Sequence, residues 1–226
     1  MAKEILNEKE ALRMEAIEET VSKTDRFYNE NKKTIWTVCG VLVVAALAIF
    51  AYVKLVYQPK CAEASQQAFP AEQLFADGEY ELALNGDGNI LGLAGVISEY
   101  GRKAGAAVCL EAGICALNIG EYEQALEYLK KYDGKEPILA ARAIACQGDA
   151  YAGLEKYADA VSAYLKAASR ADNVFAAGYL LKAGILSEQL GDKAKALSCY
   201  KKIKDEYSNS VEAYDIDKYI TRVEAE

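Results

Sequence analysis

Histidine is absent from the 226-residue chain, which removes the commonest general base and a common metal ligand. Positive charge is scarce as well, because the formal net charge is -8 at pH 7. Nucleic-acid binding requires clustered Lys and Arg against phosphate. No nucleophile elbow or Walker loop is present, and the carboxylates fit the solvent-facing sides of amphipathic helices. We therefore predict no enzymatic activity, no cofactor, no metal site and no nucleic-acid partner.

Proline is also scarce, with three residues, and the high alanine content favours helices. The six cysteines contain no Cys-x-x-Cys pair, so neither a zinc site nor a thioredoxin-like motif is predicted. Cys39 lies in an apolar stretch, and the remaining five cannot all pair within one chain. We interpret them as small buried hydrophobes. The alternative is that these five form redox-active or interchain disulfides, since Cys109, Cys115 and Cys146 are expected on the first helices of adjacent repeats and could approach one another.

One apolar stretch, residues 34–53, contains no charged residue. A helix of this length spans about 30 Å, the thickness of the hydrocarbon core of a bilayer. Trp36 at one end and Tyr52 and Tyr57 at the other fit the aromatic belts of a membrane span. A cleaved signal peptide fits less well, because a long polar segment precedes the stretch. We predict a transmembrane helix over residues 34–57.

Flanking positive charge predicts the orientation of this span, because Lys and Arg are enriched on the cytoplasmic side. Four basic residues precede it closely, whereas two follow it: Lys23, Arg26, Lys32 and Lys33 before, Lys54 and Lys60 after. We expect a single-pass protein of the bacterial inner membrane, with a cytoplasmic N-terminus and residues 60–226 in the periplasm.

The segment before the span, residues 1–33, mixes charged and apolar side chains. Ser22 and Asp25 fit a capping box that begins a helix leading into the membrane. Two interpretations remain open for this cytoplasmic segment. It is either a charged, partly helical tail or an amphipathic helix that docks on a partner.

Internal repeats predict the fold of the remaining chain. Three segments align without gaps, beginning at Gly113, Gly148 and Gly184. Each carries an alanine twelve residues later and a large side chain four residues beyond that alanine. These residues are Ala125 with Leu129, Ala160 with Tyr164, and Ala196 with Tyr200. The small glycine and alanine let two antiparallel helices cross closely.

This pattern resembles the tetratricopeptide repeat. Gly120 and Gly191 fall at the turn between the two helices of that family's repeat, and Pro137 falls at its repeat-ending proline. Glu155 replaces the turn glycine in the second unit, so we expect a less tight turn there. A helical hairpin of this kind cannot bury its apolar face alone, and stacking supplies the core.

The resemblance implies an all-α fold, a single N-terminal transmembrane helix followed by an α-solenoid. Residues 106–207 form three repeats, residues 58–105 a degenerate first hairpin with an insertion, and residues 208–226 a C-terminal capping helix. The insertion at residues 85–89 is interpreted as a glycine-rich turn, since it lacks the ligand ladder of a calcium loop. The cap is predicted from a helical spacing of apolar residues, namely Val211, Tyr214, Tyr219, Ile220 and Val223.

The first helices of the repeats are expected to line a concave partner groove. By family positions, its lining residues are Leu110, Ile114, Leu117, Asn118, Arg142, Ala145, Asp149, Leu181, Ile185 and Glu188. This surface is mixed apolar and acidic. It lacks the Lys and Asn positions that form the family's clamp for terminal carboxylates. Several of the apolar residues have a second interpretation, packing against a neighbouring helix.

The full layout, together with residues 22–35 and 113–129, resembles the YfgM-type ancillary subunits of the Sec translocon, particularly homologues from Bacteroidetes-type bacteria. The resemblance implies three kinds of partner: the subunits of the protein-conducting channel, a membrane-anchored periplasmic prolyl-isomerase chaperone, and secreted polypeptides as they emerge. The alternative hypothesis is an envelope-assembly or cell-division adaptor that tethers another complex through its repeats, because a fold does not determine a function.

Overall fold

The structure is a computed structural model that describes residues 28–170 and 173–225. The chain divides into two compact units, Met1–Gln58 and Pro59–Glu226. Regular structure in the described residues is helical, apart from one isolated bridge between Gly86 and Leu91. The predicted all-α fold class is confirmed. The capping box expected at Ser22 and Asp25 lies outside the described residues.

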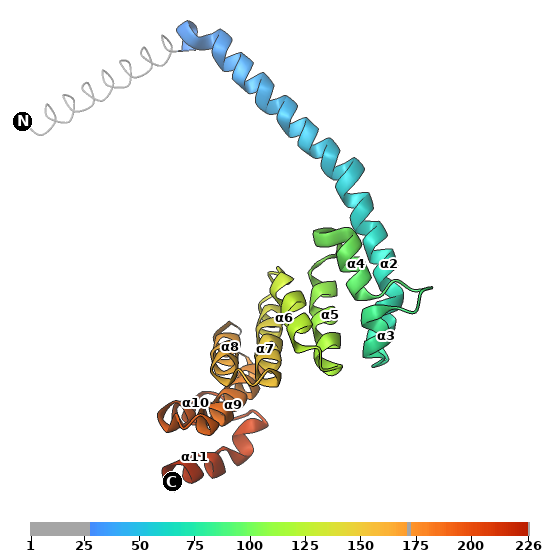
Figure 1. Cartoon of the computed structure of the whole chain (residues 1–226). Coiled ribbons are helices and arrows are strands. Elements are labelled where there is room, and N and C mark those ends of the chain that lie inside the picture. Colours follow the sequence, from blue (N-terminus) through green and yellow to red (C-terminus); the bar gives the residue numbers. More distant parts are fainter. Residues whose placement is uncertain (1–27, 171–172, 226) are drawn as a thin grey trace, which may run out of the picture. The chain divides into compact units, whose positions relative to one another are not determined.

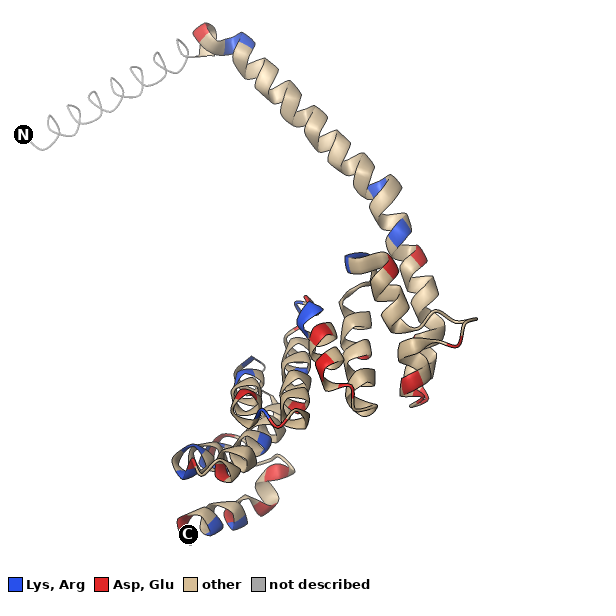
Figure 2. Cartoon of the chain, in the orientation of Figure 1, with Lys and Arg blue, Asp and Glu red and all other residues tan. Residues whose placement is uncertain are grey.

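The first unit contributes most of one apolar helix. The helical stretch Tyr28–Ala76 contains an 18-residue window with a mean hydropathy of 2.4, and none of that window is buried. Figure 2 shows a length of this helix without charged residues. By length and composition it can cross a membrane, and the exposure of its apolar residues distinguishes it from the core helix of a soluble protein. Trp36, Tyr52 and Tyr57 are all exposed.

The second unit is a series of short helices (Figure 1). It begins with α2 (Gln58–Ala76), which follows the π-helical η1 (Val53–Tyr57), and continues with α3 (Tyr80–Asn85), α4 (Leu93–Tyr100) and the 3-10 helix η2 (Gly101–Ala104). Three hairpins follow: α5 (Ala106–Asn118) with α6 (Tyr122–Lys131), α7 (Pro137–Gly153) with α8 (Tyr157–Arg170), and α9 (Val174–Gln189) with α10 (Lys193–Glu206). The 3-10 helix η3 (Glu212–Asp215) and α11 (Ile216–Ala225) end the unit.

Close crossings hold each hairpin together. A Cβ atom on Gly184 would lie 2.3 Å from Cε1 of Tyr200, and one on Gly148 would lie 2.7 Å from Cε1 of Tyr164. The large side chain of the second helix therefore lies directly against the backbone of the first. Gly113 meets Leu129 in the same way, and Ala125, Ala160 and Ala196 are completely buried.

The turns within the hairpins share one conformation. Gly78, Gly120 and Gly191 have φ angles of 84°, 83° and 79°, and Glu155 occupies the equivalent position with φ 59°. The N–H of Glu155 donates to the carbonyl of Ala152 at 3.0 Å, and the N–H of Lys156 donates to the carbonyl of Tyr151 at 2.9 Å. These are the two hydrogen bonds of a Schellman motif. The expectation of a less tight second turn is therefore wrong: the turn is preserved, and the glutamate backbone adopts the left-handed conformation.

Glu155→Gly is accordingly expected to raise the free energy of unfolding. A left-handed conformation costs a non-glycine residue about 1–2 kcal/mol, and part of this gain is offset because glycine makes the unfolded chain more flexible. We expect a net stabilisation of about 0.5–1 kcal/mol, measured by urea unfolding of the full chain in detergent. Glu127→Gly, at an exposed position in the middle of α6, should instead destabilise by a similar amount.

A further hairpin precedes the three repeats. Ala71 on α2 and Ala83 on α3 are completely buried and lie twelve residues apart, the spacing of the later glycine and alanine pairs. After α3 the chain turns at Asp87, whose Oδ1 accepts hydrogen bonds from the N–H groups of Asn89 and Ile90, both at 2.9 Å. This carboxylate therefore stabilises a turn. Within the described residues, no group of metal-ligating side chains forms there or elsewhere.

The C-terminal cap differs from its predicted helix. Ile216, Ile220 and Val223 of α11 are buried, whereas Val211 and Tyr214 are 88% and 91% exposed. The 3-10 helix η3 interrupts the helical spacing, and the Ala213 N–H donates to the hydroxyl of Ser210 at 3.2 Å as the chain turns. The five apolar residues therefore do not form the single packed face that the sequence predicted.

The core of the repeat unit consists of two clusters that meet at α7. The first contains Ala143 and Cys146 with residues of the earlier helices, and the second contains Ala145 with residues as far as Val223. Tyr151 packs against both clusters. The helix α7 thus joins the two halves of the core.

Candidate functional site: the face of the first helices

The predicted groove residues lie on α5, α7 and α9, the first helices of the three hairpins. Ile114, Leu117 and Leu181 are half-buried, and Ile185 is 40% exposed. Asn118 and Arg142 are also exposed, and the Asn118 side chain donates to the Ile114 carbonyl at 2.8 Å. We call the four apolar side chains of this set, two on α5 and two on α9, the apolar row. The α7 members that remain outside the core, Arg142 and Asp149, are polar. The three half-buried members of the row also pack against the core clusters, which leaves Ile185 as its most exposed member.

Two predicted lining residues belong to the core instead. Leu110 is 6% exposed and Ala145 is 2% exposed. For Leu110 the reason is that α5 is surrounded, since it contacts α3, α4, α6 and α7. Helix packing of this kind buries an apolar side chain that the repeat position alone would assign to the groove.

Asp149 links two hairpins through a shared hydrogen-bond network. The Tyr164 hydroxyl donates to Asp149 Oδ1 at 2.7 Å, and Lys182 Nζ donates to the same oxygen at 2.6 Å. The Lys182 ammonium also lies 5.4 Å from the centre of the Tyr164 ring. Burial and the neighbouring Asp149 carboxylate both raise the pKa of Tyr164. Asp149 therefore orders α7, α8 and α9 together.

Glu188 makes a similar link to the cap. Its two carboxylate oxygens accept hydrogen bonds from Arg222 Nε at 2.7 Å and Nη2 at 2.8 Å. The Tyr200 hydroxyl donates to Glu188 Oε2 at 3.0 Å. The hydrogen bonds from Arg222 hold the pKa of Glu188 below its usual range. Because a bidentate pair fixes geometry as well as charge, Glu188 positions α11 against α9.

Glu111 was not among the predicted site residues. It is the only charged residue of α5, which Figure 2 shows as an almost uncharged helix. Glu111 is half-buried, and its Oε2 atom is buried without a hydrogen-bond partner among the described residues. Burial, with a smaller contribution from the nearby Glu72 carboxylate, raises the pKa of Glu111 to about 7. The sequence signal was a single acid within an apolar helix.

The cysteines in this unit are free thiols. Cys109, Cys115, Cys146 and Cys199 are buried, and Cys61 is half-buried. Burial raises the pKa of Cys115 to about 12, with a smaller contribution from Glu111. Burial raises the pKa of all four buried thiols. Thiols with raised pKa values react slowly, so these four side chains pack as small hydrophobes.

Comparison with known proteins identifies the architecture. The tetratricopeptide-repeat family profile matches residues 179–210, which cover most of α9 and all of α10. The repeat unit has a tetratricopeptide-repeat fold. A solved structure described as the crystal structure of MamA protein is similar to this chain, with a TM-score of 0.56 and 18% sequence identity. The similarity covers 74% of this chain and 83% of the other. No curated protein matches the sequence.

At this identity the similarity to MamA shows the fold alone. Tetratricopeptide repeats are suited to scaffolds for protein–protein interaction, because stacked hairpins create an extended concave surface. Neither match names a Sec translocon subunit. The profile match falls on the third hairpin, and the two earlier hairpins have the same helix–turn–helix geometry in the structure.

Proposed function

We propose that this protein is a membrane-anchored scaffold of the bacterial inner membrane, which binds other proteins through the face formed by α5, α7 and α9. The observation that carries this proposal is the apolar row of Ile114, Leu117, Leu181 and Ile185. A few residues near the centre of an interface carry most of its binding energy, and burial of exposed apolar surface is favourable. The nearby carboxylates of Asp149 and Glu188 are already paired within the chain.

The partners follow from the resemblance noted in the sequence. We propose that the apolar helix crosses the membrane with its N-terminus in the cytoplasm, and that the repeat unit lies in the periplasm. The scaffold would then associate with the Sec channel and bind either a periplasmic prolyl-isomerase chaperone or secreted polypeptides. Because Asp149 and Glu188 are already paired within the chain, the apolar row is the part of this face that we expect to contact a partner. Such a surface suits a polypeptide that presents apolar side chains.

Site-specific photo-crosslinking in intact cells tests this proposal. A crosslinker at Ile185 is expected to capture channel subunits, the chaperone or secreted chains, and Ile185→Arg should weaken association with the same partner at least about tenfold, because a charge is buried against apolar groups. Ile185 is 40% exposed, so the variant should fold. Ser162, exposed on α8, provides the matched control for both the crosslinker and the arginine substitution.

Two results would contradict parts of the proposal. Recovery of only cell-division or outer-membrane assembly proteins at Ile185 would replace the Sec assignment with the adaptor function. Equal capture at Ile185 and Ser162, with equal affinities of the two arginine variants, would show that the apolar row is not the binding face.

A further inference from the structure

A separate cavity lies at the end of the first repeat hairpin. Its volume is about 420 Å³, within the range of small-ligand sites. It is bordered by α4, η2, the beginning of α5 and the end of α6, and its lining residues are Ile97, Gly101, Arg102, Gly105, Cys109, Lys130, Lys131 and Asp133. Among these side chains there are three cations and one carboxylate. The cavity is therefore positive in a chain of net charge -8.

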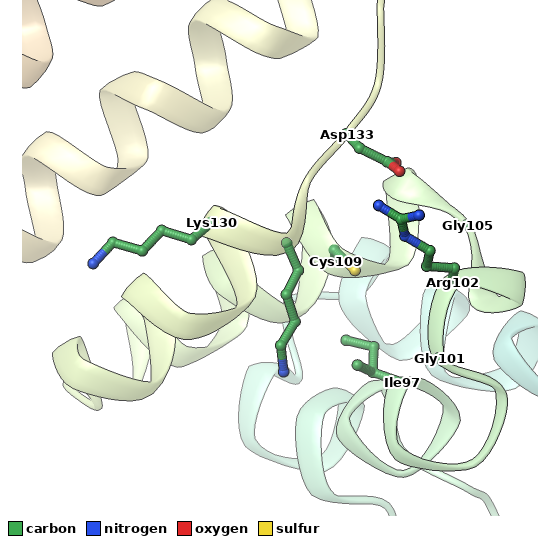
Figure 3. A pocket seen from close by; sticks show the side chains of 8 residues that line it. Ile97, Gly101, Arg102, Gly105, Cys109, Lys130 and Asp133 are labelled. Carbon is green, nitrogen blue, oxygen red and sulfur yellow. The ribbon is translucent and has the colours of Figure 1, made fainter.

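The cations of this cavity are not neutralised by salt bridges. Seven basic residues between Lys182 and Arg222 pair with carboxylates. Arg102 and Lys131 form no salt bridge with any residue that the structure describes. Asp133 and Arg102 extend into the same region in Figure 3, and no ion pair joins them within the described chain. Unpaired cations around a cavity can bind an anion without first breaking an internal contact.

The two adjacent lysines of α6 have different positions. Lys130 Nζ lies 5.8 Å from the centre of the Tyr151 ring, and its side chain points away from the other lining residues in Figure 3. Lys131 Nζ lies 5.5 Å from the centre of the Tyr128 ring, and its charge is close enough to lower the pKa of Cys109, against the larger effect of burial. Both lysines line the cavity, and Lys131 is the one whose charge acts on the Cys109 thiol in its wall.

We propose that this cavity is a binding site for an oxyanion, a phosphate-type group held by Arg102 and Lys131. The Arg102 guanidinium supplies a planar set of donors that matches two oxygens of such a group, and the Lys131 ammonium supplies a second positive charge. Ile97 and Cys109 provide an apolar wall for the part of the ligand next to the anion. Asp133 limits the net positive charge. This site is distinct from the apolar row of the first helices.

Isothermal titration of the full chain in non-ionic detergent, with inorganic phosphate at constant ionic strength, tests the site. Saturable binding is expected for the wild type. The double variant Arg102→Gln with Lys131→Gln should raise the Kd at least about tenfold, because two charge-assisted contacts are lost. Lys130→Gln removes the same charge from the adjacent position and should change the Kd by less than about twofold. Absence of saturable binding, or equal effects of Lys130→Gln and Lys131→Gln, would overturn the proposal.

Alkylation of Cys109 gives a second measurement on the wild type that does not depend on the folding of any variant. Cys109 is 7% exposed and lines the cavity. Bound phosphate should slow its modification by a thiol reagent at least about threefold at saturation, because occupancy leaves little free protein. The half-buried Cys61 on α2 should react at an unchanged rate. Equal protection of both cysteines, or of neither, would contradict the site.

The phosphate-type group has two sources, a free anion and a phospholipid head group. Titration in nanodiscs of phosphatidylcholine, with and without phosphatidylglycerol, distinguishes them. If the head group occupies the cavity, phosphatidylglycerol competes and raises the apparent Kd for inorganic phosphate, and this competition disappears in the double variant. If the site takes a soluble anion, the Kd is the same in both nanodiscs. An increase that persists in the double variant would count against the cavity.

Discussion

Gly184→Ala is expected to destabilise the protein by about 2 kcal/mol. The new Cβ would lie 2.3 Å from Cε1 of Tyr200, and the Tyr200 side chain is completely buried. Overpacking of a core typically costs about 1–3 kcal/mol or more, and the higher helix propensity of alanine returns at most about 1 kcal/mol. The hydroxyl of Tyr200 is also held by Glu188, so the ring cannot move without loosening the cap.

Gly178→Ala is the matched control on the same helix. Its Cβ would meet the flexible end of one side chain, that of Glu212, with Oε1 at 3.1 Å and Cδ at 3.9 Å. The same chemical change should therefore be neutral or stabilise by up to about 1 kcal/mol through helix propensity. Urea unfolding of both variants in detergent, followed by circular dichroism, measures the difference. Equal effects of the two substitutions would show that the crossing of α9 and α10 is looser than described.

Glu111→Gln is expected to change how stability depends on pH. The pKa of Glu111 is raised from 4.5 to about 7 in the folded protein, so folding favours the protonated carboxyl. Its stabilising effect is complete below the unfolded pKa and is lost as pH rises from about 4.5 through about 7. We expect the wild type to lose about 1–2 kcal/mol relative to Glu111→Gln between pH 5 and pH 8, after allowance for partial solvent access.

Urea unfolding at several pH values measures this difference. Glu123→Gln, an exposed residue of α6, provides a control that should leave the pH profile unchanged. Glu72 on α2 is the other carboxylate that raises the pKa of Glu111. Parallel stability profiles for wild type and Glu111→Gln between pH 5 and pH 8 would mean that Glu111 is ionised and solvated throughout this range.

The hairpins and the apolar helix could be predicted from the sequence because their signals are local. The steps between Gly113, Gly148 and Gly184 specify close helix crossings directly. The hairpin of α2 and α3 was harder to recognise from the sequence, because Ala71 takes the place of the repeat glycine. The twelve-residue spacing from Ala71 to Ala83 is nevertheless the same as in the three later repeats. At the second turn, Glu155 shows that the Schellman hydrogen bonds outweigh the preference of its own backbone.

The groove could be predicted less well, because exposure depends on how many helices surround each position. Leu110 occupies a lining position of the repeat but is enclosed by neighbouring helices, whereas Ile185 remains exposed. The pairing of Glu188 with Arg222 joins residues 34 positions apart, and no local pattern indicates it. The prediction of the cap as one helix was wrong, because the chain turns at Ser210 and the residues before Ile216 do not continue the helical spacing of α11.

The position of α7 between the two core clusters has a consequence for local unfolding of the repeat unit. Each cluster is a set of mutually packed helices, which is the structural basis of a cooperative unit in hydrogen exchange. Loss of the C-terminal cluster would remove support from one face of α7, while the other face stays packed on α5 and α6. The amides of α7 therefore belong to both cooperative units and are expected to stay protected from exchange until the N-terminal cluster also opens.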